Sequence, residues 1–326
     1  MTIETIAENI VRIEVKLPKT PLKAINSYLI RDDRRNLLID TGFNHPVSEE
    51  ALLAALDSLG VDMDRTDIFV THLHSDHAGL TQRIARPGTR IYMSEEDGRV
   101  VRKGRNSDFW ERFKEFYTFT GLYAGGHVTG VEDHPGYAYA PPEADNITFV
   151  PDGHRFDVGG YSLSCILTRG HTRGHLCLYE PDRRMLFSGD HILGSITPNI
   201  TQMSFDHDAL GEFLDSLDLI AGLEVDMVFP GHRRRIDDCR GRIEQLKRHH
   251  DTRLGEALAI VGDGRLNTVE VTRHMKWSLT IDNWEEYPPA QKLFSAGEAL
   301  AHLHYLTRRG RLKMTWDGGI VYFEKR

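Results

Sequence analysis

The chain has 326 residues, of which 40% are hydrophobic and 27% are charged, and its net charge is −8. This composition is typical of a globular protein with a core of its own, and the acidic balance argues against a general binder of nucleic acid or membrane surfaces. The chain has three cysteines without a C-x-x-C pair, no signal-peptide pattern and no run of about 20 apolar residues, so we expect a cytoplasmic protein without disulfides.

The first 94 residues are predicted to contain several strands, followed by alternating strands and helices. Strand patterns occur at 9–17, 25–30, 35–40, 67–70 and 90–94, and helical spacing of apolar residues occurs at 47–60 and 78–88. This order of elements is that of a mixed α/β domain.

Residues 95–145 interrupt this order. The stretch 95–123 has a helical pattern rich in aromatic and charged residues, and 124–144 is rich in Gly and Pro. We interpret the region as a helical insertion that covers one face as a lid. Its aromatic residues either pack the inserted helix or wall a pocket, and Phe113 and Tyr117 are the candidate substrate contacts.

Strands return in the second half of the chain, and its end differs in character. Strand patterns occur at 146–171, 176–191 and 225–232, with a helix at 206–222. Beyond residue 240, helices precede a two-stranded hairpin that turns at Asp317-Gly318-Gly319. We therefore predict a main domain at 1–240 and a small winged-helix-like domain at 241–326.

The segment THLHSDHAGL, residues 71–80, places three histidines and an aspartate within six positions after an apolar strand. Imidazole and carboxylate groups are good ligands for Zn, Fe and Mn ions. His72 and His74 point the same way in an extended chain, because the strand period is two. Asp76 and His77 would project from the first turn of a following helix, so the spacing suits two metals better than one.

Three later strand ends offer further ligands, each directly after a glycine: His171, Asp190 and His232. Glycine lacks a Cβ and allows close backbone approach in a tight turn. A carboxylate such as Asp190 can bridge two ions with its two oxygens. The chain therefore offers seven ligands for a two-ion site.

The order H-x-H-x-D-H at 72–77, then Gly-His171, Gly-Asp190 and Pro-Gly-His232, resembles the metallo-β-lactamase superfamily, as do LLIDTG at 37–42 and GHTRGH at 170–175. The resemblance covers residues 1 to about 240 and implies an α/β (α+β) fold, a four-layer αββα sandwich. It implies a first metal on His72, His74 and His171, a second on Asp76, His77 and His232, and Asp190 as the bridge. The tail resembles the winged-helix-like C-terminal domain of some hydrolases in this superfamily.

The resemblance also implies a catalytic domain at 1–240 that binds two divalent ions, with zinc the first expectation and Fe or Mn compatible with the same ligands. A hydroxide held between the two metals would be the nucleophile, and Asp76 is the candidate catalytic residue that orients it and moves protons. Asp40, His175 and His191 are expected to support the ligands. Arg233 lies either in a solvated loop or against an anionic substrate group.

Three departures from related subfamilies narrow the reaction. Asp190 stands where many zinc β-lactamases carry Cys, and His74 stands where the di-iron flavoproteins carry Glu, so antibiotic hydrolysis and oxygen reduction are disfavoured. Leu193 replaces the Tyr of the acyl-homoserine lactonases, which weakens a quorum-lactone assignment. We therefore expect a metal-dependent hydrolase of a small-molecule ester-type bond, with a thioester or a lactone as the substrate.

Three alternatives stay open at this point. The same metals serve a nuclease or phosphodiesterase, although the basic runs at 233–235 and 308–311 are short and disfavour nucleic acid. The sulfur dioxygenases of the superfamily use a single iron, and a regulatory protein could retain a vestigial site. A homodimer is open, and no membrane partner is expected.

Overall fold

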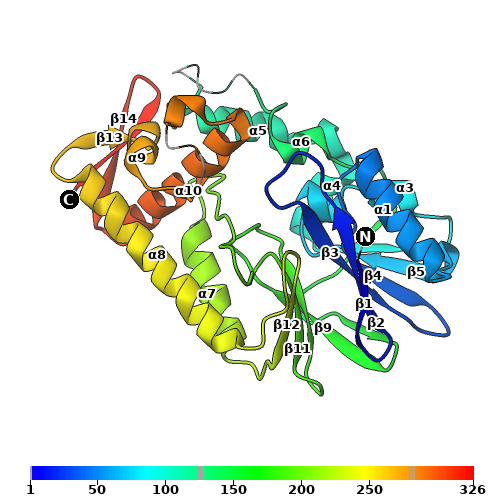
Figure 1. The fold of residues 1–326 in the computed structure, drawn as a ribbon. Helices are drawn as coiled ribbons and strands as arrows, with labels where there is room; N and C mark the ends of the chain where they lie inside the picture. Colours follow the sequence, from blue (N-terminus) through cyan, green and yellow to red (C-terminus); the bar gives the residue numbers. More distant parts are fainter. Residues whose placement is uncertain (1, 124–125, 127, 129, 279–280, 282) are drawn as a thin grey trace.

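The structure of the chain, a computed structural model, describes residues 2–123, 126, 128, 130–278, 281 and 283–326 (Figure 1). Within these residues, two large sheets lie face to face, with helices on their outer sides and a smaller helical module beside them. This arrangement confirms the α/β class and the layered sandwich that the sequence predicts.

The first sheet contains, in the described part of the chain, seven strands in sequence order. They are β1 (Ile3–Ala7), β2 (Ile10–Lys16), β3 (Ala24–Ile30), β4 (Asn36–Ile39), β5 (Thr66–Phe69), β6 (Ile91–Met93) and β7 (Ile147–Phe149). Pairing is antiparallel from β1 to β4 and parallel from β4 to β7. The change to parallel pairing follows from the crossover helices, which return the chain to the same end of the sheet each time.

The second sheet has five strands among the described residues, in the order β12-β11-β10-β9-β8. Their bounds are β8 (Arg155–Val158), β9 (Tyr161–Leu167), β10 (Leu176–Glu180), β11 (Met185–Gly189) and β12 (Met227–Pro230). Only the β11–β12 pair is parallel within this set, because α7 (Ala209–Ala221) crosses between them.

Three layers of buried apolar side chains hold the sheets and helices of the sandwich together. One lies between the first sheet and α1 (Pro46–Ser58), with α2 (Ser75–Ala78), α3 (Thr81–Ile84) and α4 (Glu95–Lys103) on the same side. A second lies between the two sheets and includes Tyr28, Phe187 and Phe229, whose rings contact one another. The third covers the outer face of the second sheet and continues into the helices beyond it. Burying both faces of each sheet fixes the strand register.

The C-terminal module packs against α7. Its elements are α8 (Cys239–Val261), β13 (Arg265–Asn267), α9 (Thr268–His274), α10 (Pro289–Arg308), β14 (Leu312–Asp317) and β15 (Ile320–Lys325). The strands pair in the order β13-β15-β14, and the expected hairpin at Gly318-Gly319 joins β14 to β15. The winged-helix assignment and the domain boundary at residue 240 stay predictions.

The helical pattern predicted over 95–123 is divided into two helices, α4 and α5 (Phe109–Thr118), by a 3₁₀ turn at Gly104–Asn106. Gly104 has a φ of 51°, and a Cβ there would lie 2.4 Å from the carbonyl oxygen of Pro141. The chain therefore needs glycine at this point, and the helix ends. A short helix, α6 (Pro135–Ala138), lies in the predicted loop, whose residues 124, 125, 127 and 129 are outside the described part.

Two simpler expectations can be compared directly with the described residues. Cys165, Cys177 and Cys239 are buried free thiols. Among the helices that the structure describes, none is long and apolar enough to cross a bilayer.

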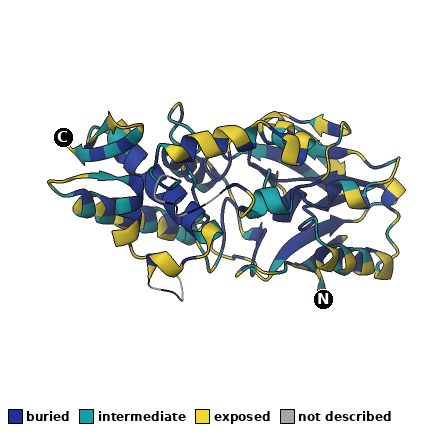
Figure 2. Ribbon diagram, turned by 90° about the horizontal axis from the view of Figure 1, so that it is seen from above, coloured by how far each residue is buried: buried dark blue, intermediate teal, exposed yellow. Residues whose placement is uncertain are grey.

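The apolar layer outside the second sheet joins the sandwich to the C-terminal module. Phe213 and Leu217 of α7, Leu246 of α8 and Leu300 of α10 are all fully buried within it. Figure 2 shows dark-blue, buried segments in the sheets and equally in the adjoining C-terminal helices. Each such side chain contributes roughly 1.5–3 kcal/mol when it is removed from water.

Deleting residues 241–326 would expose this layer, so we expect a chain that ends at residue 240 to be insoluble or only partly folded. The full chain should unfold in one cooperative transition. Solubility and thermal unfolding, followed by circular dichroism, would measure both. A soluble 1–240 chain with an unfolding temperature close to that of the full chain would contradict the expectation.

Candidate metal centre

The histidine loop connects β5 to α2 and has the local structure that its sequence predicts. His74 has extended backbone angles (φ −63°, ψ 143°) and directly precedes α2. Asp76 and His77 lie in the first turn of α2, as expected. The extended part of the loop therefore aims His72 and His74 at one point, and the helix aims Asp76 and His77 at another.

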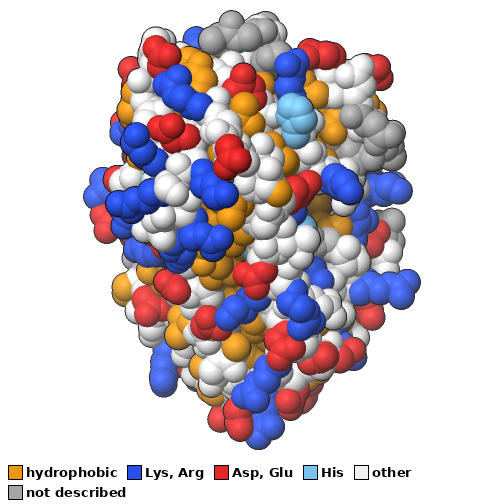
Figure 3. Space-filling model, turned by 90° about the vertical axis from the view of Figure 1, so that its left-hand side faces the viewer, with side chains coloured by type: hydrophobic (Ala, Val, Ile, Leu, Met, Phe, Trp, Pro, Cys, Tyr) orange, Lys and Arg blue, Asp and Glu red, His pale blue; other side chains and the backbone are white. Residues whose placement is uncertain are grey.

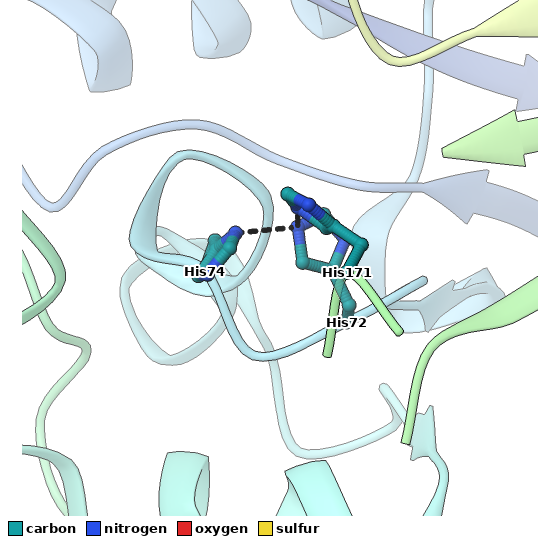
Figure 4. A group of neighbouring side chains, drawn as sticks. All are labelled: His72, His74 and His171. Atoms are coloured by element: carbon teal, nitrogen blue, oxygen red, sulfur yellow. Dashed lines mark hydrogen bonds between the residues drawn. The ribbon is translucent and has the colours of Figure 1, made fainter. Parts of the chain in front are cut away.

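The first ligand group consists of His72, His74 and His171 (Figure 4). His72 Nε2 lies 3.0 Å from His74 Nδ1 and 3.3 Å from His171 Nε2. Nitrogens that bind one tetrahedral zinc ion at about 2.1 Å lie roughly 3.4 Å apart. The spacing of these nitrogens therefore fits a single cation between them.

The second group consists of Asp76, His77 and His232. Asp76 Oδ2 lies 3.2 Å from His232 Nε2 and 4.0 Å from His77 Nε2. Asp190 lies between the two groups, because its carboxylate is 3.4 Å from His77 Nε2, 3.5 Å from His232 Nε2 and 3.8 Å from His171 Nε2. The structure thus brings together all seven ligands that the sequence predicts.

The outer nitrogen of each of four ligand rings has a hydrogen-bond acceptor. In His77, Nδ1 lies 2.7 Å from Asp40 Oδ2, and in His72 it lies 2.9 Å from Thr71 Oγ1. In the other two rings the acceptor is a backbone carbonyl oxygen. Nδ1 of His171 lies 2.8 Å from that of Asn199, and Nδ1 of His232 lies 2.8 Å from that of Ala24. A ring that donates through Nδ1 keeps the lone pair of Nε2 toward the centre. This is the arrangement by which proteins orient histidines for metal binding.

Three inner atoms of the site lack a well-aligned hydrogen-bond partner among the described residues. His77 Nε2, His232 Nε2 and Asp190 Oδ1 are buried and unpaired. Each such atom costs about 1–3 kcal/mol if nothing satisfies it. A cation satisfies all three at once, so the residues present fit a metal ion. The mixed nitrogen and carboxylate donors are compatible with Zn, Fe or Mn.

The charges in the site favour the metal-binding forms of His72, His74 and the two carboxylates. Burial lowers the pKa of His72 and His74, and neighbouring imidazoles lower it further, so both rings are neutral. Burial raises the pKa of Asp190, but His232 and His77 outweigh it and hold the pKa well below its usual range. Burial likewise opposes ionisation of Asp76, while His77 and His232 lower its pKa. The carboxylates are therefore ionised when the site forms. Burial lowers the pKa of His77 and His232, but the neighbouring carboxylates outweigh it and raise the pKa of both, so a cation would replace a proton on these two rings.

All three glycines before the later ligands are required by space. Gly170 has a φ of 125°, and a Cβ there would collide with Phe213. Gly189 has a φ of 47°, and a Cβ there would lie 2.7 Å from His175 Nε2. A Cβ at Gly231 would lie 2.6 Å from Asp190 Oδ1 and 2.7 Å from His77 Cε1. The Gly-ligand pairs thus let the strand ends β11 and β12 approach one another closely.

The three expected supporting residues have different surroundings. Asp40, with φ 58°, accepts hydrogen bonds from His77 and from the Thr71 amide and hydroxyl. His175 accepts from the Asp190 amide at 3.2 Å, and its other nitrogen contacts Thr168 Oγ1. His191 packs on Phe213 with both nitrogens unpaired among the described residues, and burial lowers its pKa to about 3. Asp40 and His175 thus contact ligands, and His191 is a neutral core residue.

Asp97 of α4 is a residue that the sequence did not single out. Its carboxylate accepts hydrogen bonds from the Leu73 amide (3.0 Å), the Thr172 hydroxyl (2.6 Å) and the Gly174 amide (2.9 Å). It thereby joins the loop of His72 and His74 to the loop of His171 and His175. Burial raises its pKa to about 6, against these three hydrogen bonds. Acidic residues are common in the first turn of a helix, so the position of Asp97 in the sequence does not indicate this role.

A cavity of about 610 Å³ opens beside His74 and His171. Its apolar wall includes Phe109, Phe113, Phe116, Phe119, Met203 and Phe205, and its charged residues include Glu96, Arg112, Glu115, Arg173, Asp206 and Glu212. The insertion therefore forms one wall of a pocket at the site.

The three tentative substrate residues lie in different places. Phe113 lines the cavity. Tyr117 is fully buried, stacks on Phe113 and donates a hydrogen bond to the Gln202 carbonyl, so it lies behind the wall. Arg233 has a φ of 70° and donates to the Pro21 carbonyl, away from the residues that line the cavity. Contact of Tyr117 or Arg233 with a substrate has no support from these positions.

Comparison with known proteins shows which families are similar to this chain in sequence and fold. Residues 20–232 match the Metallo-beta-lactamase superfamily, and residues 287–326 match the family described as Metallo-beta-lactamase-like, C-terminal domain. The chain is 24% identical over 264 residues to lactamase-like protein adaB of Aspergillus niger, covering 81% of this chain. The aligned segments span 57–67% of the length of such fungal relatives.

Two crystal structures are similar to the whole chain. A metallo-beta-lactamase family protein from Thermus thermophilus has a TM-score of 0.83 and 27% identity, covering 99% of this chain and 100% of that one. A beta-lactamase domain protein from Burkholderia ambifaria has a TM-score of 0.80 and 22% identity, covering 99% and 95%. The sandwich and the C-terminal module thus occur together in other proteins.

Substitution Gly231→Ala should weaken zinc binding by about tenfold or more, because the new methyl group would displace Asp190 and His77. Competition with a chromophoric chelator would measure the affinity. Gly255→Ala in α8 is the matched control, since a Cβ there meets no atom within 4 Å. Equal zinc affinities for the two variants would contradict the geometry.

Proposed function

The chain belongs to the metallo-beta-lactamase superfamily, and we propose that it is a metal-dependent hydrolase that cleaves a thioester or lactone with an apolar acyl group at a two-metal site. The observation that carries this proposal is the phenylalanine-lined cavity that opens on His74 and His171. Of the two bonds, the thioester is favoured, since Leu193 is buried and offers no hydroxyl group near the site.

The seven ligands would hold two cations, with zinc the first choice. His72, His74 and His171 would bind one, Asp76, His77 and His232 the other, and Asp190 both. Two bound cations would make a water molecule more acidic and polarise the substrate carbonyl. The protein itself contributes buried imidazoles and ionised carboxylates.

Asp76 is the residue best placed to move protons. It is 8% exposed, and its carboxylate lies 3.2 Å from His232 Nε2. In the proposed reaction, water adds to the acyl carbon, the bond from that carbon to sulfur or ring oxygen breaks, and an acid and a thiol or alcohol form. Asp76 would take one proton from the water and return it to the leaving atom.

The charges around the cavity favour a neutral or weakly charged substrate. Its two arginines are already paired, Arg112 with Asp108 and Arg173 with Asp206. Four further acidic groups line the same cavity. Over the face of the C-terminal module in Figure 3, acidic side chains lie among the basic ones. A polyanion such as RNA would meet repulsion as well as attraction, which weakens the nuclease alternative.

We expect zinc-loaded protein to hydrolyse a medium-chain acyl thioester with a higher kcat/KM than a lactone of equal length or bis(p-nitrophenyl) phosphate. A chelator should abolish the activity and added zinc should restore it. Asp76→Asn should lower kcat by about 10²–10⁴-fold even at saturating zinc, a condition that is needed because Asp76 also belongs to the second ligand group. Preference for the phosphodiester, or activity that survives chelation, would contradict the proposal.

Phe113→Ala should raise KM for an octanoyl thioester about tenfold and leave KM for an acetyl thioester nearly unchanged. The reason is that a short acyl group does not reach the phenylalanine wall, whereas a long one loses about 1–3 kcal/mol of apolar contact. Phe149→Ala, a change of the same size outside the lining of the cavity, is the control. Equal effects on both chain lengths would show that Phe113 only supports the fold.

A further inference from the structure

The loop from Asn199 to Gln202 lies directly on helix α10 of the C-terminal module. The Gln202 amide donates a hydrogen bond to the Gly297 carbonyl at 3.2 Å. A Cβ on Gly297 would lie 2.7 Å from Thr201 Cγ2 and 2.4 Å from the Tyr117 hydroxyl. Glycine at this position therefore allows the helix to contact both the loop and the inserted helix α5.

A hydrogen-bonded path runs from α10 to the first ligand group. Glu298 Oε2 accepts from Asn199 Nδ2 at 2.8 Å. The carbonyl oxygen of the same Asn199 lies 2.8 Å from His171 Nδ1. The Asn199 amide also contacts the Phe294 carbonyl at 3.4 Å, and its side-chain oxygen accepts from Thr201 at 2.6 Å. The side chain of Asn199 is thus fixed by three hydrogen bonds, while its backbone carbonyl contacts the ring of His171.

Glu298 is an unusual residue for the packed face of a helix. It is 9% exposed, and burial raises its pKa to about 7, with Arg253 and Asn199 acting in the opposite direction. A buried carboxyl group is costly unless its hydrogen bonds are made. Its hydrogen bond with Asn199 therefore offsets part of the cost of burying this carboxyl group.

We propose that Glu298 is a positioning residue for the metal centre, which fixes the carbonyl of Asn199 and through it the ring of His171. The C-terminal module then contributes to the metal site from a helix that holds none of the ligands. Helix α10 also contacts Thr201, which lines the cavity. This inference rests on the metal centre of the proposed function and is independent of the substrate.

The proposal can be tested by zinc affinity, measured by chelator competition on Glu298→Ala, Glu298→Gln and Asn199→Ala. We expect the two alanine variants to bind the first zinc ion about tenfold more weakly, as for other residues that orient a ligand. Glu298→Gln should retain nearly full affinity, because its amide oxygen can still accept from Asn199. Ser295→Ala, which removes a buried hydroxyl from the same helix, should behave as the wild type.

Thermal unfolding of the metal-free variants separates positioning from folding. The proposal stands if Glu298→Ala loses affinity with an unfolding temperature near that of Ser295→Ala, or if Asn199→Ala does so where Glu298→Ala does not fold. It falls if Glu298→Ala folds and binds zinc normally, if Asn199→Ala binds zinc normally where Glu298→Ala does not fold, or if Glu298→Gln is as weak as Glu298→Ala. If the wild type does not bind zinc, both the metal centre and the positioning role of Glu298 are contradicted. If the wild type binds zinc normally but hydrolyses none of the substrates, only the proposed reaction is contradicted.

Discussion

The structure depends on one constraint: seven polar side chains that lose water must face one another around a common centre. Five imidazoles and two carboxylates converge within the spacing of metal ligands, and several of their inner atoms have no well-aligned hydrogen-bond partner in the described structure. Such groups would rotate away or draw in water unless they were held from outside. The outer contacts are therefore as important as the ligands, and they come from Asp40, Asn199, Ala24 and Thr71.

The ligands could be predicted from the sequence because their chemistry is local. Each is a His or Asp in a loop that follows a strand or in the short helix that such a loop enters, and the spacing of four of them is set by an extended segment that becomes a helix. The outer contacts could not be predicted in the same way. Two of them are backbone carbonyls, which every residue has, and Asp97 resembles any acid in the first turn of a helix. Such roles are decided by which loops the fold brings together, and this information is non-local.

In the insertion too, non-local contacts decide a difference that the sequence pattern does not predict, here between two residues of one helix. Phe113 and Tyr117 are four positions apart, so the helical period places them on one face, and the pattern treats them alike. In the structure Phe113 faces the cavity, whereas Tyr117 is covered by the loop at Gln202 and by α10. Aromatic residues surround much of α5, and the difference is set by the C-terminal module that packs on it. The division of the helical stretch at Gly104 is likewise set by a residue distant in sequence, Pro141.

The long sequence separations within the site determine the order in which it can form. The carbonyl that orients His232 belongs to Ala24, 208 positions earlier, and the helix that holds Asn199 is among the last elements of the chain. Contacts of such separation form late in folding, because loop closure must be overcome before they stabilise anything. A chain emerging from the ribosome therefore exposes its histidine loop well before the other three ligands and the helix that holds Asn199 have been made. The seven candidate ligands and the contacts that orient them therefore come together only after the C-terminal module has been made.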